Sequence, residues 1–254
     1  MLNEQEIDNL REGGKKLVTI LQAIKEATKP GVNLKTLEEI AEREAVLTGG
    51  ILSFKGYRGY PAPVCLSVNE EIVHCIPRDR VLNAGDIVSV DAGLYYKGVH
   101  TDMAVTWPVG QVSPEVKRLL QGTYAALLSG TEAIRPDNHV NDISSAIEKV
   151  LRGRGLTIFK QFVGHGIGRQ LHEDPMIPNF ATKVPGLKLQ PGIALALEPI
   201  AGLGGEAVDQ DGNQWDTRAA DGKPVAHFEY TVLVTDSGFE VITPLETLIG
   251  GQKY

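Results

Sequence analysis

The sequence contains little cysteine and no long apolar run. Its 254 residues include only two cysteines, Cys65 and Cys75, which excludes a framework of several disulfides and favours a reducing compartment. No apolar stretch approaches the roughly 18 residues that a membrane-spanning helix needs. The charged segment 1–16 does not resemble a secretory signal. We therefore expect a cytoplasmic protein that does not associate with membranes.

The sequence also has no excess of positive charge. The chain carries 25 Lys and Arg against 32 Asp and Glu, a formal net charge of −7, and its basic residues are scattered. We therefore expect no direct binding of nucleic acid. The composition, 42% hydrophobic and 22% charged, is typical of a globular protein long enough to bury one large core.

Periodic apolar residues divide the chain into helical and strand-like parts. Helical spacing predicts helices over 4–28 and 34–47, and the segment 51–108 is strand-like. Two further helices are predicted over 114–134 and 139–153. The rest of the chain is mainly strand-like, which indicates an α+β protein.

Two segments far apart in the chain share a local pattern. In Leu82–Asp91 and in Leu189–Glu198, a glycine precedes a β-run and a carboxylate closes it six residues after that glycine. A histidine lies upstream of each run, His74 in the first case and His165 in the second. One such match between two buried strands is expected by chance, but the matching helices, histidines and carboxylates together favour an internal duplication.

The duplicated halves would span approximately residues 30–110 and 136–240. Each half then contains helices joined by a proline turn, followed by strands. A duplicated unit of this kind offers a cleft between its halves, surrounded by equivalent residues from both.

Four carboxylates end or interrupt strands that otherwise read as buried. They are Asp91, Asp102, Glu198 and Glu229. An ionised carboxylate beside an apolar run is costly unless it is paired or bound to a metal. Each one taken singly fits a strand end that faces solvent, or a partner of an arginine. The set of four instead favours a metal site.

The spacing of the two aspartates adds a geometric argument. A turn centred between Tyr96 and Lys97 would place Asp91 opposite Asp102 on neighbouring strands, with Cβ atoms about 5 Å apart. A turn centred one residue later would offset the pair. Two carboxylates at this separation repel each other when no cation lies between them. A dication between them removes the repulsion.

The segment 162–175, FVGHGIGRQLHEDP, is the most distinctive in the chain. Its glycines would let backbone approach the imidazole of His165, and the sequence fits neither of the usual phosphate-binding patterns. We interpret His165 as a metal ligand and His172 as a second ligand or a donor to substrate. A core histidine bonded to backbone remains an alternative for both.

The last carboxylate lies in a strong strand candidate, residues 226–235. His227 shares the parity of Glu229 and is either its neighbour in the site or a polar surface residue. Four carboxylates and one histidine form an oxygen-rich donor set, which suits two divalent ions about 3.5–4 Å apart. A cysteine-rich structural zinc site is excluded because the chain lacks the thiols.

The five candidate ligands occur in a characteristic order along the chain. That order is Asp91, Asp102, His165, Glu198, Glu229. Together with the motif GHGIGRQLHEDP it resembles the type I methionine aminopeptidases, over residues 4–250 or so. The resemblance implies a pita-bread fold, with two pseudo-twofold-related αβ halves around a curved antiparallel sheet. It also implies a single catalytic domain spanning 1–254.

The resemblance further implies roles for the site residues. The five ligands would hold two divalent ions, of cobalt, manganese, iron or zinc. The residues implied to be catalytic are His74, His172 and Glu198. The residues implied to bind substrate are His74, His172, Tyr57, Tyr60, Cys65 and Trp215. Aromatic and polarizable side chains suit a thioether, although core packing is an alternative for Tyr57 and Trp215.

The activity implied is removal of the N-terminal methionine from peptides and nascent chains, near the ribosome, by a monomer. Cleavage would be preferred before a small residue and would use a water activated by two metal ions. The alternatives are an X-Pro aminopeptidase or prolidase, which usually carries an extra N-terminal domain, and a non-catalytic binding protein of the same fold, which typically lacks some ligands.

Two positions depart from the family pattern. The chain has Cys75 in a His-Cys-Ile-Pro segment where the family has glycine, and Leu171 where it has phenylalanine. Leu171 would widen the methionine pocket, and Cys75 would place a soft thiol beside the metals.

Overall fold

The structure, a computed structural model, describes residues 1–249. The helices are α1 (Glu4–Ala27), α2 (Leu34–Thr48), the 3-10 helix η1 (Tyr57–Gly59), α3 (Pro114–Glu132), α4 (Val140–Gly153) and α5 (Glu246–Ile249). The strands are β1 (Ile51–Leu52), β2 (Cys65–Val68), β3 (Ile87–Tyr96), β4 (Val99–Pro108), β5 (Thr157–Ile158), β6 (Val163–Gly166), β7 (Glu173–Pro178), β8 (Ala194–Leu197), β9 (Ile200–Gly202), β10 (Val208–Gln210), β11 (Thr217–Ala219), β12 (Val225–His227), β13 (Tyr230–Thr235) and β14 (Gly238–Val241).

The long helices begin and end at local sequence signals. Asn3 and Glu6 form a capping box at the start of α1, each side chain accepting a hydrogen bond from the other residue's backbone N–H. Helix α2 ends at Gly49, whose φ of 72° is left-handed. Ser113 caps α3 and Pro114 is its first residue. All four predicted helices are confirmed.

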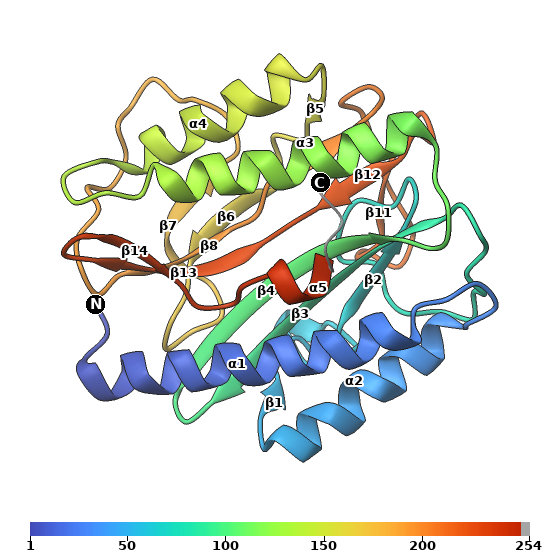
Figure 1. The fold of residues 1–254 in the computed structure, drawn as a ribbon, viewed down its shortest axis with the longest axis horizontal. Coiled ribbons are helices and arrows are strands. Elements are labelled where there is room, and N and C mark those ends of the chain that lie inside the picture. Colours follow the sequence, from blue (N-terminus) through green and yellow to red (C-terminus); the bar gives the residue numbers. More distant parts are fainter. Residues whose placement is uncertain (250–254) are drawn as a thin grey trace.

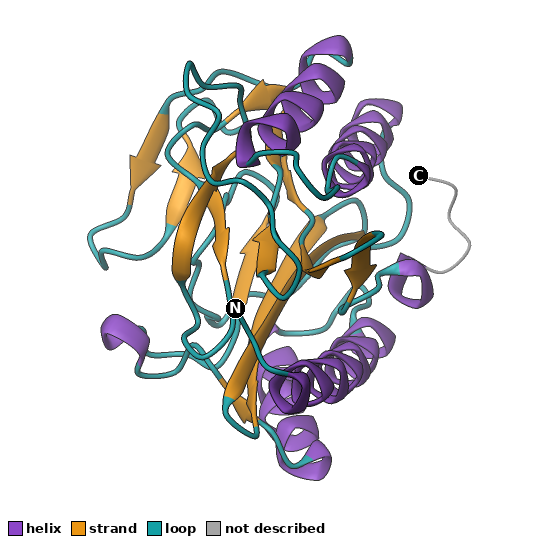
Figure 2. Ribbon diagram, turned by 90° about the vertical axis from the view of Figure 1, so that its left-hand side faces the viewer, coloured by secondary structure: helices purple, strands orange, loops and turns teal. Residues whose placement is uncertain are grey.

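The strands form antiparallel sheets in two halves of similar plan. A four-stranded sheet contains β1, β3 and β2 in that order, with β4 paired to β3, and a five-stranded sheet has the order β14-β13-β8-β6-β7. In Figure 1, α1 and α2 run across the lower part of the molecule and α3 and α4 across its upper part. The side view in Figure 2 shows the long helices gathered on one face of the curved strand layer. The α+β prediction, with αβ halves around a curved antiparallel sheet, is confirmed.

One apolar core joins the helices to the strands. Each long helix buries a single apolar face, exemplified by Leu17, Ile20 and Ile24 of α1 and by Ile143 and Ile147 of α4. Burial of each such side chain contributes about 1.5–3 kcal/mol. No helix within residues 1–249 is both long and apolar enough to cross a bilayer.

The turn between β3 and β4 decides the register of the two aspartates. Tyr96 pairs with Val99, so Lys97 and Gly98 form a two-residue loop. Both loop residues have positive φ, 46° and 97°, as a type I′ hairpin turn requires. The turn is therefore centred between Lys97 and Gly98, and the placement of Asp91 directly opposite Asp102 is wrong.

The alternative register, offset by one residue in the turn, is the one observed. Asp91 pairs with Ala104, and Asp102 pairs with Gly93. Because side chains alternate along a strand, the two aspartates still lie on the same face, as diagonal neighbours. Both carboxylates therefore still project from the same side of the sheet.

Candidate active site

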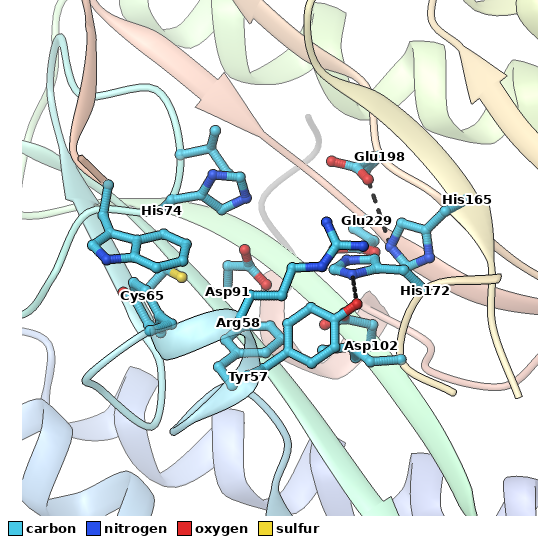
Figure 3. Close-up of a pocket in the computed structure, with 15 residues that line it drawn as sticks. Tyr57, Arg58, Cys65, His74, Asp91, Asp102, His165, His172, Glu198 and Glu229 are labelled. Atoms are coloured by element: carbon cyan, nitrogen blue, oxygen red, sulfur yellow. Dashed lines mark hydrogen bonds and ion pairs between the residues drawn. The ribbon is translucent and has the colours of Figure 1, made fainter. Parts of the chain in front are cut away.

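A cavity of about 140 Å³ lies between the two halves. All the site residues singled out from the sequence line it, and Figure 3 shows most of them pointing toward one another. The other lining residues are Phe54, Arg58, Val73 and Leu171. The structure thus brings the predicted residues together, while their individual roles stay predictions.

The two glutamates enter the cavity at breaks between strands. Glu198 lies between β8 and β9, and Glu229 lies between β12 and β13. At Glu198 the chain passes from the five-stranded sheet to the three-stranded sheet β12-β9-β5, and at Glu229 it passes back to the five-stranded sheet. The prediction of one continuous strand over 226–235 is therefore wrong, because the chain changes sheets at Phe228 and Glu229.

His165 presents one ring nitrogen to the cavity. Its Nδ1 lies 2.9 Å from the carbonyl oxygen of Gly166, and a carbonyl only accepts, so Nδ1 carries the proton. The lone pair is then on Nε2, which lies 3.7 Å from Glu198 Oε1. A backbone partner that fixes the ring in this way is typical of a metal-ligating histidine.

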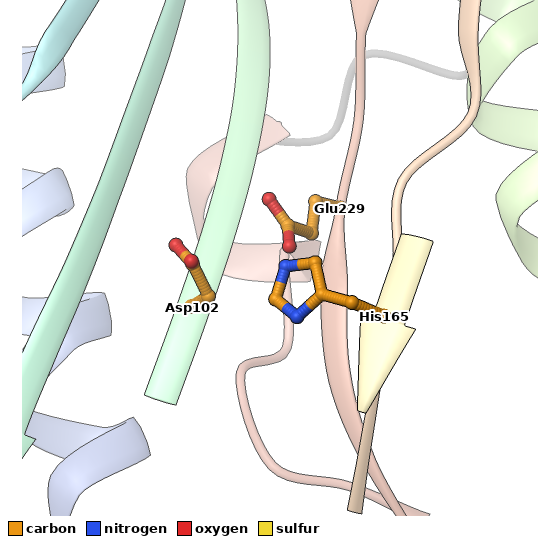
Figure 4. A group of neighbouring side chains, drawn as sticks. All are labelled: Asp102, His165 and Glu229. Atoms are coloured by element: carbon orange, nitrogen blue, oxygen red, sulfur yellow. The ribbon is translucent and has the colours of Figure 1, made fainter. Parts of the chain in front are cut away.

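Three of the candidate ligands are close enough to hold an ion. One ligand atom from each of Asp102, His165 and Glu229 lies within 4.8 Å of the others. Figure 4 shows the three side chains grouped together. These residues come from β4, from β6 and from the break before β13, so the cluster forms only when the two halves pack together.

The glycines beside His165 serve the neighbouring strands rather than the imidazole. A Cβ on Gly164 would overlap the carbonyl oxygen of Ala196, and a Cβ on Gly166 would overlap that of Asp174. Strand β6 lies between β7 and β8. Glycine is therefore required for close approach of backbone on both sides.

The buried carboxylates need positive charge. Burial raises the pKa of Asp91 to about 7, and burial together with the neighbouring carboxylates raises the pKa of Asp102, Glu198 and Glu229 well above the usual range. Within residues 1–249, Asp91 Oδ1 and Glu229 Oε1 are buried without a hydrogen-bond partner. Hard cations among these oxygens would remove both penalties, so the residues present fit divalent metal ions.

Hydrogen bonds across the molecule fix the backbone of two ligands. The Asp102 N–H donates to Thr231 Oγ1 at 2.8 Å, which ties β4 to β13. Asn179 Nδ2 donates to the Glu198 carbonyl oxygen at 3.0 Å. The ligand positions are therefore held by partners from distant parts of the chain.

Two further histidines face the cavity. His172 Nδ1 lies 2.8 Å from the Tyr57 hydroxyl. Burial, together with Coulombic interactions with His165 and with the Arg58 guanidinium, lowers the pKa of His172 to about 3, so its ring is neutral. His74 is exposed at the rim, with a left-handed φ of 62°.

A larger groove of about 850 Å³ adjoins the cavity. The two share Arg58, Val73, His74, His165, His172 and Glu198. The groove therefore opens onto the same cluster of side chains and provides a path from solvent to the carboxylates.

Arg58 is a lining residue that the sequence interpretation missed. Its guanidinium lies over the Tyr57 ring, with Cζ 5.3 Å from the ring centroid. One signal in the sequence was the position of Arg58 between Gly56 and Gly59. Both glycines have positive φ in the loop at the cavity mouth. The position of Arg58 between two predicted pocket tyrosines was a second signal.

One of the two cysteines, Cys75, differs from expectation. Cys75 does not line the cavity, and its thiol donates to the carbonyl oxygens of Val73 and Thr217 at 3.6 Å. The expectation that Cys75 stands beside the metals is therefore wrong. Cys65 on β2 is the thiol nearest the ligands, because it pairs directly with Asp91 of β3.

His227 is buried beside the glutamates. It is 1% exposed, so the interpretation as a polar surface residue is wrong. Its Nε2 lies 3.8 Å from Glu198 Oε2 and 3.8 Å from Glu229 Oε2. Burial lowers the pKa of His227 to about 3, so the ring is neutral.

Known proteins share both the sequence pattern and this arrangement. The pattern of metallopeptidase family M24 matches residues 8–236. The chain belongs to metallopeptidase family M24. Membership makes it a metal-dependent hydrolase, in agreement with the donor set described above, and the family binds divalent metal.

The chain is similar over nearly its full length to curated members of the family. It is 40% identical over 239 residues to methionine aminopeptidase 1 of Bacillus subtilis, covering 94% of this chain and 96% of that protein. It is 41% identical over 241 residues to a methionine aminopeptidase of Clostridium perfringens, covering 95% and 97%. The resemblance stated from the motifs is confirmed.

Solved structures agree with the sequence relatives. The methionine aminopeptidase of Thermotoga maritima superposes with a TM-score of 0.93 at 36% identity, covering 95% of this chain and 98% of that chain. The prolidase of Pyrococcus furiosus shares the fold, with a TM-score of 0.79 at 19% identity, but this chain covers only 65% of it.

Proposed function

We propose that the chain is a methionine aminopeptidase that removes the N-terminal methionine from peptides and nascent chains, preferentially before a small residue. The supporting observation is the convergence of four carboxylates and His165 on one cavity, with buried carboxylate oxygens left without a partner. The names of the relatives, which match over nearly their full length, support the same substrate.

The ligands proposed for two divalent ions are Asp91, Asp102, His165, Glu198 and Glu229. The four carboxylates and the His165 imidazole would together hold the ions. When bound, two such ions supply a water whose pKa is lowered toward neutrality. Cobalt, manganese, iron and zinc all remain candidates for this donor set.

The side chains around the ligands would handle protons and charge. Glu198 would accept the proton from the attacking water. With the Tyr57 hydroxyl as donor to His172 Nδ1, 2.8 Å away, the Nε2–H of His172 would hydrogen-bond the scissile carbonyl oxygen as negative charge develops there. His74, at the rim, would bind the amide nitrogen that becomes the leaving amine.

The small cavity suits a methionine side chain. Its apolar wall includes Tyr60, Cys65 and Trp215. The rings of Tyr60 and Trp215 pack edge to face, with their centroids 5.1 Å apart. A cavity of about 150 Å³ holds a molecule as large as benzene, so about 140 Å³ accommodates the four heavy atoms of this side chain. A thioether packs favourably against such aromatic edges.

The adjoining groove suits the chain that follows the methionine. It is open to solvent and holds several times the volume of the small cavity. An extended nascent chain emerging near the ribosome would lie along it. We further propose a cytoplasmic monomer, with residues 1–254 forming one catalytic domain that arose by duplication of approximately 30–110 and 136–240.

A peptide assay separates this function from its alternatives. Met-Ala-Ser is expected to be cleaved after methionine, whereas Ala-Pro-Ala is expected to be left intact, and a chelator should abolish the cleavage. Release of free methionine measured by chromatography provides the readout. Preferential cleavage of the X-Pro peptide would point to a prolidase-like enzyme, and cleavage of neither by the metal-loaded protein would point to a binding protein.

Leu171 is expected to set how strictly methionine is selected. The side chain is 2% exposed, and a Cβ on the neighbouring Gly93 would lie 3.3 Å from its Cδ1. Leu171→Phe should narrow the cavity and raise the preference for Met-Ala-Ser over Phe-Ala-Ser by about 10-fold in kcat/KM, the scale of steric discrimination in apolar pockets. An unchanged ratio would show that Leu171 does not limit the pocket.

A further inference from the structure

His227 is a buried polar residue that the proposed mechanism does not use. Among the described residues its Nε2 has no hydrogen-bond partner, although the atom is fully buried. Two carboxylate oxygens, Glu198 Oε2 and Glu229 Oε2, each lie 3.8 Å from it. An orphaned buried nitrogen is costly, so its position between two proposed ligands calls for a function.

The chemistry of the neighbours indicates the role of Nε2. A bare lone pair facing two carboxylates would be repelled by both. An N–H at the same place is attracted to both, and it satisfies lone pairs that the metal ions leave free. The separation of 3.8 Å slightly exceeds a hydrogen bond, so a small shift of either carboxylate completes one.

The backbone of His227 is fixed independently of the glutamates. Its N–H donates to Thr106 Oγ1, and that hydroxyl donates to the His227 carbonyl oxygen, both at 2.8 Å. Ser89 Oγ lies 2.8 Å from the same hydroxyl. These contacts anchor β12 to β4, so the imidazole is held at a set position while the glutamates adjust.

We propose that His227 is a positioning residue that holds the carboxylates of Glu198 and Glu229 in their metal-binding orientation through its Nε2–H. It does not line the cavity, in contrast to His165. This inference rests on the proposed metal centre. Partners of this kind are typically worth 10–100-fold in metal affinity.

The test compares two variants of equal length at this position. Gln retains an N–H at the end of an unbranched side chain, whereas Met has a similar shape without a donor. His227→Met should weaken Co²⁺ binding by about 10–100-fold, and His227→Gln should bind within a few-fold of the parent. Calorimetric titration and the cobalt absorption spectrum are measured on the full chain, and thermal unfolding of the metal-free forms checks that each variant folds.

The outcomes separate the hypotheses. Equal Co²⁺ affinity in the parent, His227→Gln and His227→Met would overturn the positioning role. Loss of affinity in both variants, with an altered cobalt spectrum in His227→Gln, would overturn it too, because it would make the imidazole a direct ligand. His139→Gln on the surface is the matched control and should bind like the parent. Absence of Co²⁺ binding by the parent would instead refute the metal centre itself.

Discussion

Glu198→Gln is expected to lower kcat by about 10²–10⁴-fold, the contribution typical of a general base. The amide keeps the shape of the carboxylate but accepts no proton, and it weakens one metal ligand. Steady-state cleavage of Met-Ala-Ser at saturating metal measures the loss. Because metal loading is saturated, the residual defect reports on proton transfer rather than on ion binding.

The same variant should fold at least as well as the parent. Burial raises the pKa of the Glu198 carboxyl, and the neighbouring carboxylates of Asp91 and Asp102 raise it further. Removing one potential charge from that cluster relieves repulsion in the metal-free protein. Glu206→Gln, in an exposed loop, is the matched control and should keep full activity. Near-parental turnover of Glu198→Gln would refute its role as the base.

Metal-free protein is expected to lose stability as the pH rises from about 6.5 toward 8, where histidines that burial keeps neutral in the fold are neutral in the unfolded chain as well. The pKa of Asp91 is raised from 3.8 to about 7 in the folded state, so the unfolded chain releases this proton first. The folded state then binds more protons than the unfolded state across this interval. Its free energy of unfolding therefore falls with pH, by up to about 1.4 kcal/mol per pH unit for each such proton.

Urea unfolding of metal-free protein at a series of pH values measures this effect. Saturating Co²⁺ should reverse the trend, because cations stabilise the ionised carboxylates and compete with protons. At a free-ion concentration of 100 times Kd, one bound ion adds about 2.7 kcal/mol. A stability that does not change between pH 6.5 and 8 without metal would show that the pKa values of the buried carboxylates are not raised in the fold.

The pairing register shows where sequence reasoning reached its limit. The sequence left two turns open, one that places Asp91 directly opposite Asp102 and one that offsets the pair. The choice between them depended on the positive φ of Lys97 and Gly98, a property of the twisted hairpin. The observed loop was the alternative that the sequence left open.

The glutamates and His227 illustrate a second limit. Apolar runs predicted strands beside Glu198 and Glu229, but nothing in the runs signalled that the chain changes sheets at each carboxylate. That change turns the side chains of the two glutamates inward. It also buries His227, for which the sequence had left both a surface position and a position in the site open. Arg58 was missed for a similar reason, since its loop reaches the cavity mouth only in the folded chain.

The sequence by itself determined the four long helices, the α+β class and the identity of the candidate ligands. Helix caps, apolar periodicity and the GHGIG motif act over a few residues, so they can be read without the fold. The tertiary structure decided the strand register, the sheet changes at the glutamates, the burial of His227 and the place of each cysteine. Those features depend on free energies of pairing and burial between segments far apart in the chain, and such free energies exist only once the two halves have packed together.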